Sequence, residues 1–369
     1  MRFEPVQPRG GLLAVHAHPD DETLATGALL ATWAASGEPV TLVTCTRGEQ
    51  GEVIGAELAH LEGDGPALAA HREGELATAL ASLGVSDHVF LDQVETGEPG
   101  GSPGQVGERA FRDSGMAWAA PGIARAAAEA DLPEGALVGV PLDEAARRLA
   151  HVLRERRPRV VVTYEPSGGY GHPDHVRAHE ITVRAIELAR EKDPAVPDGG
   201  APDPEVVQAG GARTGDPSVG HDLELWQSVV PAEVARAARR ELAGLPEVAT
   251  LRAEHPELTL PDPDEPLPPV AKTGLEEVVV VDVGPVLGAV AGALRAHATQ
   301  VKHVGVAPGR VDRDPTGDAP AEVLGWYALS NDVLAALPSR EFYTVTSESA
   351  GASRTFTGND QTGPVAWTQ

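Results

Sequence analysis

Residues 12–31 read LLAVHAHPDDETLATGALLA, and this stretch decides the fold class. An apolar run over 12–17 ends abruptly in His-Pro-Asp-Asp-Glu, and a helical pattern follows over 20–36 until Gly37. Three adjacent carboxylates repel one another, so they are tolerated best where a positive charge offsets them. A helix N-terminus supplies part of that charge, and a metal ion supplies more. The stretch therefore predicts a strand followed by a helix, and the charge of its three acids is offset either by the helix N-terminus alone or by a metal ion as well.

Short β-branched runs continue to alternate with longer helical patterns from residue 12 to about 190. This alternation predicts an α/β fold in which a mostly parallel sheet is flanked by helices. The candidate strands are 12–17, 40–46, 88–92 and 159–165, and the candidate helices are 20–36, 70–83 and 142–156. A strand over 276–283 and a helix over 284–300 are expected to follow.

Composition divides the chain into three parts. Residues 1–190 carry the α/β pattern of a catalytic core. Residues 191–275 are rich in Pro, Gly and acid, with one helical island around PAEVARAARRELAGL, and this composition predicts a surface insertion or linker. Residues 276–369 are too few to stand alone, so we expect them to complete the same catalytic unit.

Charge and apolar content restrict the partners of the protein. The chain has 55 acidic and 29 basic residues and a formal net charge of −26, which argues against nucleic acid or an anionic membrane as partner. The single Cys45 lies in the apolar run VTLVTC and is expected to be a buried, inert thiol. No apolar run approaches the roughly 20 residues of a membrane span. We expect a cytoplasmic protein that acts on a small molecule; its oligomeric state is not indicated.

A second histidine-rich segment, GYGHPDH over 169–175, follows the strand predicted at 159–165. Ligands of open α/β sheets bind beyond the carboxyl ends of the strands, where both histidine-rich segments fall. His18 and Asp21 are three residues apart across a helix start and can face one point, while His175 comes from the other loop. Two histidines and one carboxylate with an open position for water form a catalytic zinc set. The same donors also accept ferrous iron.

The remaining polar residues of the two segments suit acid–base chemistry. Asp20 points about a third of a turn away from Asp21, so it can act as general base instead of metal ligand. His172 can turn toward the substrate with Asp174 orienting its ring, and Tyr170 can donate to a developing oxyanion. The proton that the departing amine needs can come from Asp20 or from His172.

Structural explanations exist for individual residues. The HPDDE segment alone could be an acid-rich helix start, but a second His-Pro-Asp segment after another strand favours a metal site. His16 points to the other side of its strand and is interpreted as a core histidine. His179 follows His175 by one turn and is interpreted as a surface residue or as a partner of the metal ligands.

The two segments, AHPDDE and GHPDH, resemble the zinc-dependent LmbE/PIG-L family of N-deacetylases. Further stretches resemble the branch of this family that acts in mycothiol biosynthesis. They are TCTRGEQGEVIG (44–55), HREGELATALASLGV (71–85), FRDSGM (111–116) and RAHATQV (295–301). The likeness is dense over 11–190, sparse over 191–275, and returns near 295 and at 330–345.

The resemblance implies a Rossmann-like α/β sandwich without a nucleotide and with one zinc ion per subunit. It implies zinc on His18, Asp21 and His175, Asp20 as general base, and His172 with Tyr170 stabilising the tetrahedral intermediate. It also implies sugar recognition by Glu52, Arg72 and Asp113. The implied reaction removes acetate from 1-D-myo-inosityl 2-acetamido-2-deoxy-α-D-glucopyranoside and leaves the free amine. A polar sugar–inositol substrate needs such fixed partners, since a buried unpaired donor costs about 1–3 kcal/mol.

Other functions remain open at this point. The nearest is the mycothiol S-conjugate amidase branch of the same family, which typically carries a lysine shortly after AHPDDE, where this chain has Thr23-Leu24-Ala25-Thr26-Gly27. Another N-acetylglucosaminide deacetylase is a further alternative. A silent carbohydrate-binding relative would be expected to lose Asp20 or a ligand, and a dinucleotide-binding protein would need G-x-G-x-x-G after the first strand. This chain keeps Asp20 and all three candidate ligands, and it has no G-x-G-x-x-G motif after the first strand.

Overall fold

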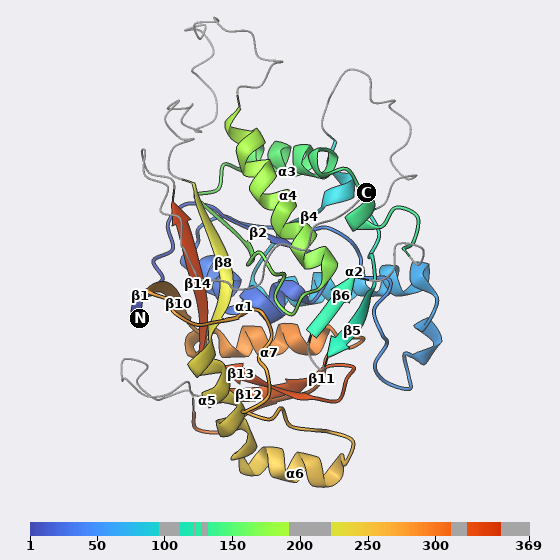
Figure 1. The fold of residues 1–369 in the computed structure, drawn as a ribbon, viewed down its shortest axis with the longest axis vertical. Helices are drawn as coiled ribbons and strands as arrows, with labels where there is room; N and C mark the ends of the chain where they lie inside the picture. Colours follow the sequence, from blue (N-terminus) through green and yellow to red (C-terminus); the bar gives the residue numbers. More distant parts are fainter. Residues whose placement is uncertain (96–110, 121–122, 127–131, 192–222, 311–322, 348–369) are drawn as a thin grey trace, which may run out of the picture.

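In the part of the chain that the structure describes, the strands form one large mixed sheet, a three-stranded sheet and a hairpin (Figure 1). The computed structural model describes residues 1–95, 111–120, 123–126, 132–191, 223–310 and 323–347. The large sheet has the order β1-β10-β14-β8-β7-β2-β3-β4, with β9 paired to β8. Its strands are β1 (Arg2–Pro5), β2 (Leu12–His16), β3 (Val40–Thr44), β4 (Asp87–Phe90), β7 (Val160–Tyr164), β8 (Glu224–Pro231), β9 (Ala271–Lys272), β10 (Glu277–Asp282) and β14 (Arg340–Ser347).

Helices cover both faces of the large sheet. One face carries α1 (Asp21–Ser36), α2 (Gly65–Leu83) and α7 (Leu287–Ala296), and the other carries α3 (Leu142–Arg156) and α4 (Pro173–Arg190). Strands β8, β7, β2, β3 and β4 run parallel, and β14 is antiparallel to both of its neighbours. The predicted class, a mostly parallel sheet flanked by helices, is confirmed.

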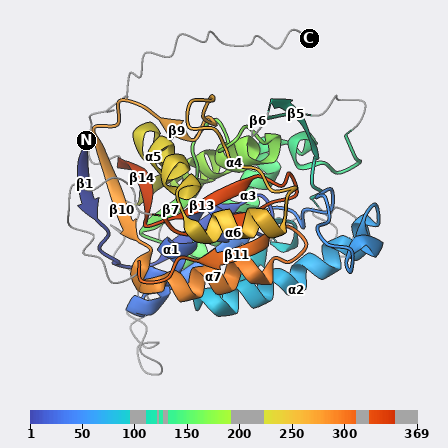
Figure 2. The ribbon, with the colours of Figure 1, turned by 90° about the horizontal axis from the view of Figure 1, so that it is seen from below.

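The smaller elements gather at one end of the large sheet. They are α5 (Ala232–Ala243), α6 (Pro246–Glu254), and the antiparallel sheet of β11 (Lys302–Val306), β12 (Val323–Ala328) and β13 (Leu334–Pro338) (Figure 2). A separate hairpin pairs β5 (Met116–Ala120) with β6 (Ile123–Ala126). Short 3-10 turns lie at Ala59–Leu61, Leu91–Gln93, Leu137–Gly139 and Gly284–Val286.

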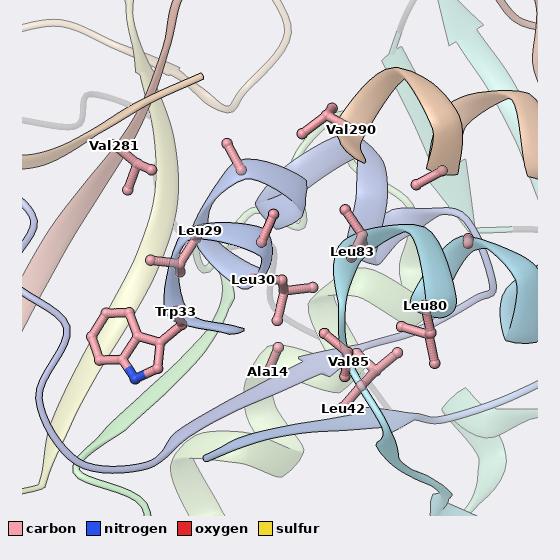
Figure 3. Close-up of a cluster of buried hydrophobic side chains, with 14 of the residues drawn as sticks. Ala14, Leu29, Leu30, Trp33, Leu42, Leu80, Leu83, Val85, Val281 and Val290 are labelled. Carbon is pink, nitrogen blue, oxygen red and sulfur yellow. The ribbon is translucent and has the colours of Figure 1, made fainter. Parts of the chain in front are cut away.

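Burial of apolar side chains from α1 fixes this helix on the sheet (Figure 3). Leu29, Leu30 and Trp33 are at most 1% exposed and pack in one cluster with Ala14 of β2. Trp33 also meets Trp226 of β8 edge to face, with the ring centroids 5.9 Å apart. The packing holds the N-terminal end of α1 beside the carboxyl end of β2, where the acidic segment lies.

The interpretation of residues 191–275 as an insertion or linker is wrong for residues 223–275. This part supplies β8, which lies between β7 and β14 inside the large sheet, and also α5, α6 and β9. The apolar alternation of LELWQSVVP is short, and its Pro- and Gly-rich flanks hide it from a reading of composition. Residues 192–222 lie outside the described part of the chain.

Two expectations about burial and membranes can be compared with the structure. Cys45 is fully buried at the end of β3, and burial raises the pKa of its thiol, as expected for an inert cysteine. Among the described residues, no helix combines the length and the apolar character that crossing a membrane requires.

Helix α1 is interrupted near its middle, and a distant carboxylate caps the second half. Thr26 has the non-helical angles φ −144° and ψ 15°. The freed N–H groups of Ala28 and Leu29 donate to the two carboxylate oxygens of Glu341 in β14, at 2.8 and 2.9 Å. Burial nevertheless raises the pKa of Glu341 to about 7, against these bonds and the one from the Tyr343 hydroxyl. Glu341 therefore serves as a helix cap that binds a proton near neutrality.

Because of Glu341, the free energy of unfolding is expected to fall as the pH rises from about 4.5 to about 7. The unfolded carboxyl ionises near 4.5 and the folded one near 7, so in this window the folded state holds more protons and rising pH favours unfolding. Urea midpoints of wild type and Glu341→Gln, measured at pH 5 and pH 8, test this. The difference in urea midpoint between the two proteins should change with pH. A second, pH-independent loss of stability is expected in Glu341→Gln, because the amide oxygen replaces only one of the two acceptor oxygens. A pH-independent difference would contradict the assignment.

Candidate active site

The two His-Pro-Asp segments meet at the carboxyl ends of adjacent parallel strands. β2 and β7 pair in register, Leu12 with Val160, and each strand leads into a helix that begins with one of the segments. Helix α4 starts at Pro173, a position where proline is pre-organised for the helix. Gly171 has φ +94°, and a Cβ there would lie 2.8 Å from the Ala124 carbonyl oxygen, so the turn before α4 requires glycine.

The carboxylate of Asp21 lies between two histidines. Its Oδ2 is 3.3 Å from Nδ1 of His18, and its Oδ1 is 3.2 Å from Nε2 of His175. All three side chains are at most 10% exposed. Burial alone would raise the pKa of Asp21, but His175 and His18 hold it well below its usual range. The carboxylate is therefore ionised, and the three side chains present four donor atoms to a small volume.

Hydrogen bonds on the far side of each ring leave the facing nitrogens free to bind a metal. Nδ1 of His175 lies 3.2 Å from the Gly168 carbonyl oxygen, which can only accept, so Nε2 carries the lone pair. Within the described residues that buried Nε2 makes no hydrogen bond. Nε2 of His18 lies 3.2 Å from the Asp174 carboxylate, which leaves Nδ1 for a metal. This arrangement of oriented ligands fits zinc or another divalent ion.

Acidic groups around His18 add to the demand for a cation. Asp113 Oδ1 lies 3.5 Å from Nε2 of His18, beside Asp174, and all three residues are buried. Burial lowers the pKa of the His18 imidazole, but Asp113, Asp174 and Asp21 outweigh it and raise the pKa well above its usual value. In the absence of a metal, a proton on the His18 imidazole offsets part of this negative charge. A metal ion and a proton therefore compete for His18.

His172 faces the same centre but with a different hydrogen-bonding pattern. A ring nitrogen each from His18, His172 and His175 can lie within 4.8 Å of one another, so a three-histidine metal set is also geometrically possible. However, Nδ1 of His172 accepts from the Asp174 backbone N–H at 3.1 Å, which places its proton on Nε2. Burial and the two neighbouring histidines lower its pKa well below 6.5. His172 is therefore a neutral donor.

The predicted role of Asp174 is wrong in one respect. Its carboxylate does not reach His172; it accepts from the Ser114 N–H at 2.8 Å and the Ser114 hydroxyl at 2.5 Å, and it faces His18. The hydrogen bond to the His172 ring comes from the backbone N–H of Asp174. Asp174 thus orients His18, and Ser114 is a site residue that the sequence did not reveal.

Asp20 lies at the N-terminal end of α1 in a strained conformation. Its φ is +109°, which is uncommon for a residue other than glycine and costs on the order of 1–3 kcal/mol. Glu22 holds this conformation because its Oε2 accepts from the Asp20 N–H at 2.9 Å. Burial raises the pKa of Asp20 to about 6, against the charge of Arg72, whose Nη2 lies 3.3 Å from Oδ2. A carboxylate with this pKa suits general base catalysis.

The RAHATQV segment supports the site from α7. Nε2 of His297 lies 2.7 Å from Oε1 of Glu22, and both side chains are at most 1% exposed. Thr299 donates from its N–H and its hydroxyl to the Glu75 carboxylate, at 2.8 and 2.6 Å. Together these bonds join α1, α2 and the end of α7. Arg72 and Glu75, three residues apart on α2, are both buried and bond to other groups than each other.

The three residues expected to bind sugar occupy different surroundings. Arg72 is 2% exposed and donates to the carbonyl oxygens of Gly48 and Pro19. Asp113 lies within the buried cluster beside His18. Glu52 is exposed in the loop after β3, with its carbonyl oxygen bonded to Gln300. Their contact with a sugar stays a prediction.

Aromatic and histidine neighbours complete the surroundings of His175. Tyr164 stacks on its ring with centroids 4.2 Å apart, and Tyr170 approaches it edge-on at 5.1 Å. His16 bonds Thr26 at 2.9 Å, and His179 bonds the Tyr164 carbonyl oxygen at 2.9 Å. The last two histidines support the fold around the site and do not join the donor set.

Known proteins match both the core and most of the full length. A family model described as "PIG-L: GlcNAc-PI de-N-acetylase" matches residues 13–186. A protein of Streptomyces avermitilis named 1D-myo-inositol 2-acetamido-2-deoxy-alpha-D-glucopyranoside deacetylase is 38% identical over 347 residues, which cover 93% of this chain and 94% of the relative. The chain belongs to the PIG-L family.

A second relative extends this result. A protein of the same name from Kineococcus radiotolerans is 47% identical over 295 residues, covering 80% of this chain and 70% of the relative. The family predicted from AHPDDE and GHPDH is thereby confirmed. Residues 13–186 of the PIG-L match contain α1, β7 and most of β2 and α4, the two strand–helix units around the donor set.

Proposed function

We propose that the protein hydrolyses the N-acetyl group of 1D-myo-inosityl 2-acetamido-2-deoxy-α-D-glucopyranoside, with one zinc ion held by His18, Asp21 and His175. The observation that supports this most strongly is the Asp21 carboxylate held between two ring nitrogens whose tautomers suit a metal. Relatives named for this reaction cover most of the chain. The products are acetate and the free amine.

His18, Asp21 and His175 would hold a metal ion, which would supply Lewis-acid chemistry that polarises the amide carbonyl and makes the attacking water a stronger acid. Asp20 takes a proton from the attacking water, for which its raised pKa and its position next to Asp21 are suitable. His172 presents its Nε2–H, and Tyr170 its hydroxyl, to the oxygen that becomes negative in the tetrahedral intermediate. Asp174 keeps His18 in the required tautomer.

The C–N bond then breaks, and the nitrogen gains a proton as the amine leaves. Asp20 can return the proton that it took from water, and His172 can donate the proton on Nε2. Glu22 and Arg72 act on this step indirectly, since they hold the backbone and the carboxylate of Asp20. Overall, one water adds across one amide bond, and no oxidant or nucleotide is required.

Hydrolysis of three substrates by the zinc-loaded protein tests the proposal. The substrates are the inosityl N-acetylglucosaminide, free N-acetylglucosamine and a mycothiol S-conjugate, and the amine released from each is quantified. We expect kcat/KM to be highest for the inosityl compound. Fastest cleavage of the S-conjugate would make the protein an amidase of the same family. Metal binding without hydrolysis of any of them would refute the substrate assignment.

A further inference from the structure

A second group of metal-ligating side chains lies outside the active-site donor set, where the end of α6 meets β11. His255, Glu257 and His303 each place one ligand atom there, and these atoms all lie within 4.8 Å of one another. His255 directly follows α6, and His303 belongs to β11. Both elements are part of the layer at one end of the large sheet (Figure 2). The proposed amide hydrolysis makes no use of these three residues.

His303 lies in an irregular part of β11. Its φ is +55°, and the pairing of β11 with β12 shifts register between Lys302 and Gly305. Such a bulge re-aims a side chain, and here the ring centroids of His303 and His255 lie 4.3 Å apart. Two protonated rings at this distance repel each other, whereas one metal ion can bind a lone pair of each ring. The irregular strand thus brings two imidazole donors together from separate elements.

The distance between His255 and Glu257 fits a shared metal ion. Nδ1 of His255 lies 3.3 Å from Oε1 of Glu257, just beyond the about 2.7–3.2 Å of an N–H···O hydrogen bond. Two ligand atoms that each lie about 2.0–2.1 Å from a tetrahedral zinc ion are about 3.3 Å apart. In the active site, Nδ1 of His18 and Oδ2 of Asp21 show the same separation of 3.3 Å.

The surroundings leave the three donors available to a cation. Lys302 precedes His303, but its ammonium group is paired with the Asp332 carboxylate, which offsets its charge. The loop after α6 is fixed, because the Thr259 N–H donates to the Asp332 carbonyl oxygen at 2.8 Å. The side chain of Glu257 is 48% exposed, so a hydrated ion can enter from solvent.

We propose that His255, Glu257 and His303 form a second zinc site, with water as the fourth ligand, that joins the end of α6 to β11. Two histidines and one carboxylate are a donor set that zinc accepts. In the described part of the chain, neither ring has a hydrogen-bonded partner like those that orient His18 and His175. Such partners contribute about 10–100-fold to metal affinity, so the second site binds zinc more weakly than the active site.

Zinc content tests this site. The protein is equilibrated with buffered zinc and then dialysed against a weak chelator, and zinc is measured by elemental analysis at both stages. We expect two ions per wild-type chain at first and one afterwards. His255→Gln and His303→Asn, in which asparagine tolerates the positive φ, should hold one ion at both stages. His151→Gln is the matched control, since His151 is exposed on α3 and should leave both counts unchanged.

Thermal unfolding gives a second readout. An ion that binds only the folded chain stabilises it, so zinc added to protein that already holds one ion should raise Tm in wild type and His151→Gln but not in His303→Asn. An equal rise in all three proteins, or two ions in His303→Asn, would place the second ion elsewhere and overturn the proposal.

The active site and the second site can be told apart in the same experiment. His175→Ala should still take up one zinc ion from buffered zinc and release it to the chelator, which would show that the second site binds independently. A wild-type protein that binds a single ion, lost in His175→Ala, would refute the second site and leave the proposed hydrolysis untouched.

Discussion

The His175→Ala protein is expected to lose at least about 100-fold in zinc affinity and, with the metal, its hydrolytic activity. His175 is the donor that α4 contributes, and its Nε2 has no hydrogen bond to another group of the described chain. Removing the ring leaves His18 and Asp21, which come from a single turn and cannot close a site. Metal content after dialysis against a weak chelator, by elemental analysis, measures the effect.

Two neighbouring histidines supply the controls for this result. His179→Gln should keep the metal, because His179 contacts the Tyr164 carbonyl and glutamine can still donate there. His172→Ala should also keep it, because His172 has its proton on the nitrogen that faces the site. Loss of metal from His172→Ala together with full metal in an Asp21→Ala protein would instead favour the three-histidine set. Far-UV circular dichroism of each variant separates loss of metal from loss of fold.

The sequence is sufficient to predict that the two His-Pro-Asp segments meet, and the reason is geometric. Parallel neighbouring strands place their carboxyl ends at one edge, so two segments that each follow a strand meet whatever the length of chain between them. His18 and His175 are 157 positions apart in the numbering, yet both reach Asp21. Spacing within one turn then determines which side chains of each segment face the same point.

The partners behind the ligands could not be predicted in this way. Ser114 bonds Asp174 from a loop, and His297 bonds Glu22 across 275 residues. Neither contact follows from a period or a strand order, because each depends on how α7 and the loop at 111–115 pack. Glu341 caps α1 from a strand 313 residues away from Ala28 for the same reason. Local patterns do not encode such distant contacts.

Strand β8 was missed for a different physical reason. A central strand of a parallel sheet is normally recognised as a long apolar run, and β8 reads ELWQSVVP with a polar Gln-Ser pair in its middle. Both residues are half-buried, so the strand lacks the uninterrupted apolar pattern that would identify it.

Replacing Asp20 by asparagine is expected to lower kcat by about 10²–10⁴-fold and to leave zinc bound. The amide is the same size as the carboxylate and, like aspartate, tolerates positive φ better than most residues, so the backbone at +109° can persist. It cannot take a proton from water at neutral pH. Because Asp21 provides both carboxylate oxygens that face the histidines, the metal does not depend on Asp20.

Asp64→Asn is the matched control for Asp20→Asn. Asp64 also lies at the start of a helix, where its Oδ1 accepts from the Ala67 N–H at 3.1 Å, but it is exposed. The same substitution there should leave kcat unchanged. A zinc-loaded Asp20→Asn protein that keeps more than about a tenth of kcat would show that another group takes the proton, since general base catalysis contributes at least about 10²-fold. A metal-free one would make Asp20 a ligand, and the division of labour between adjacent Asp20 and Asp21 would have to be abandoned.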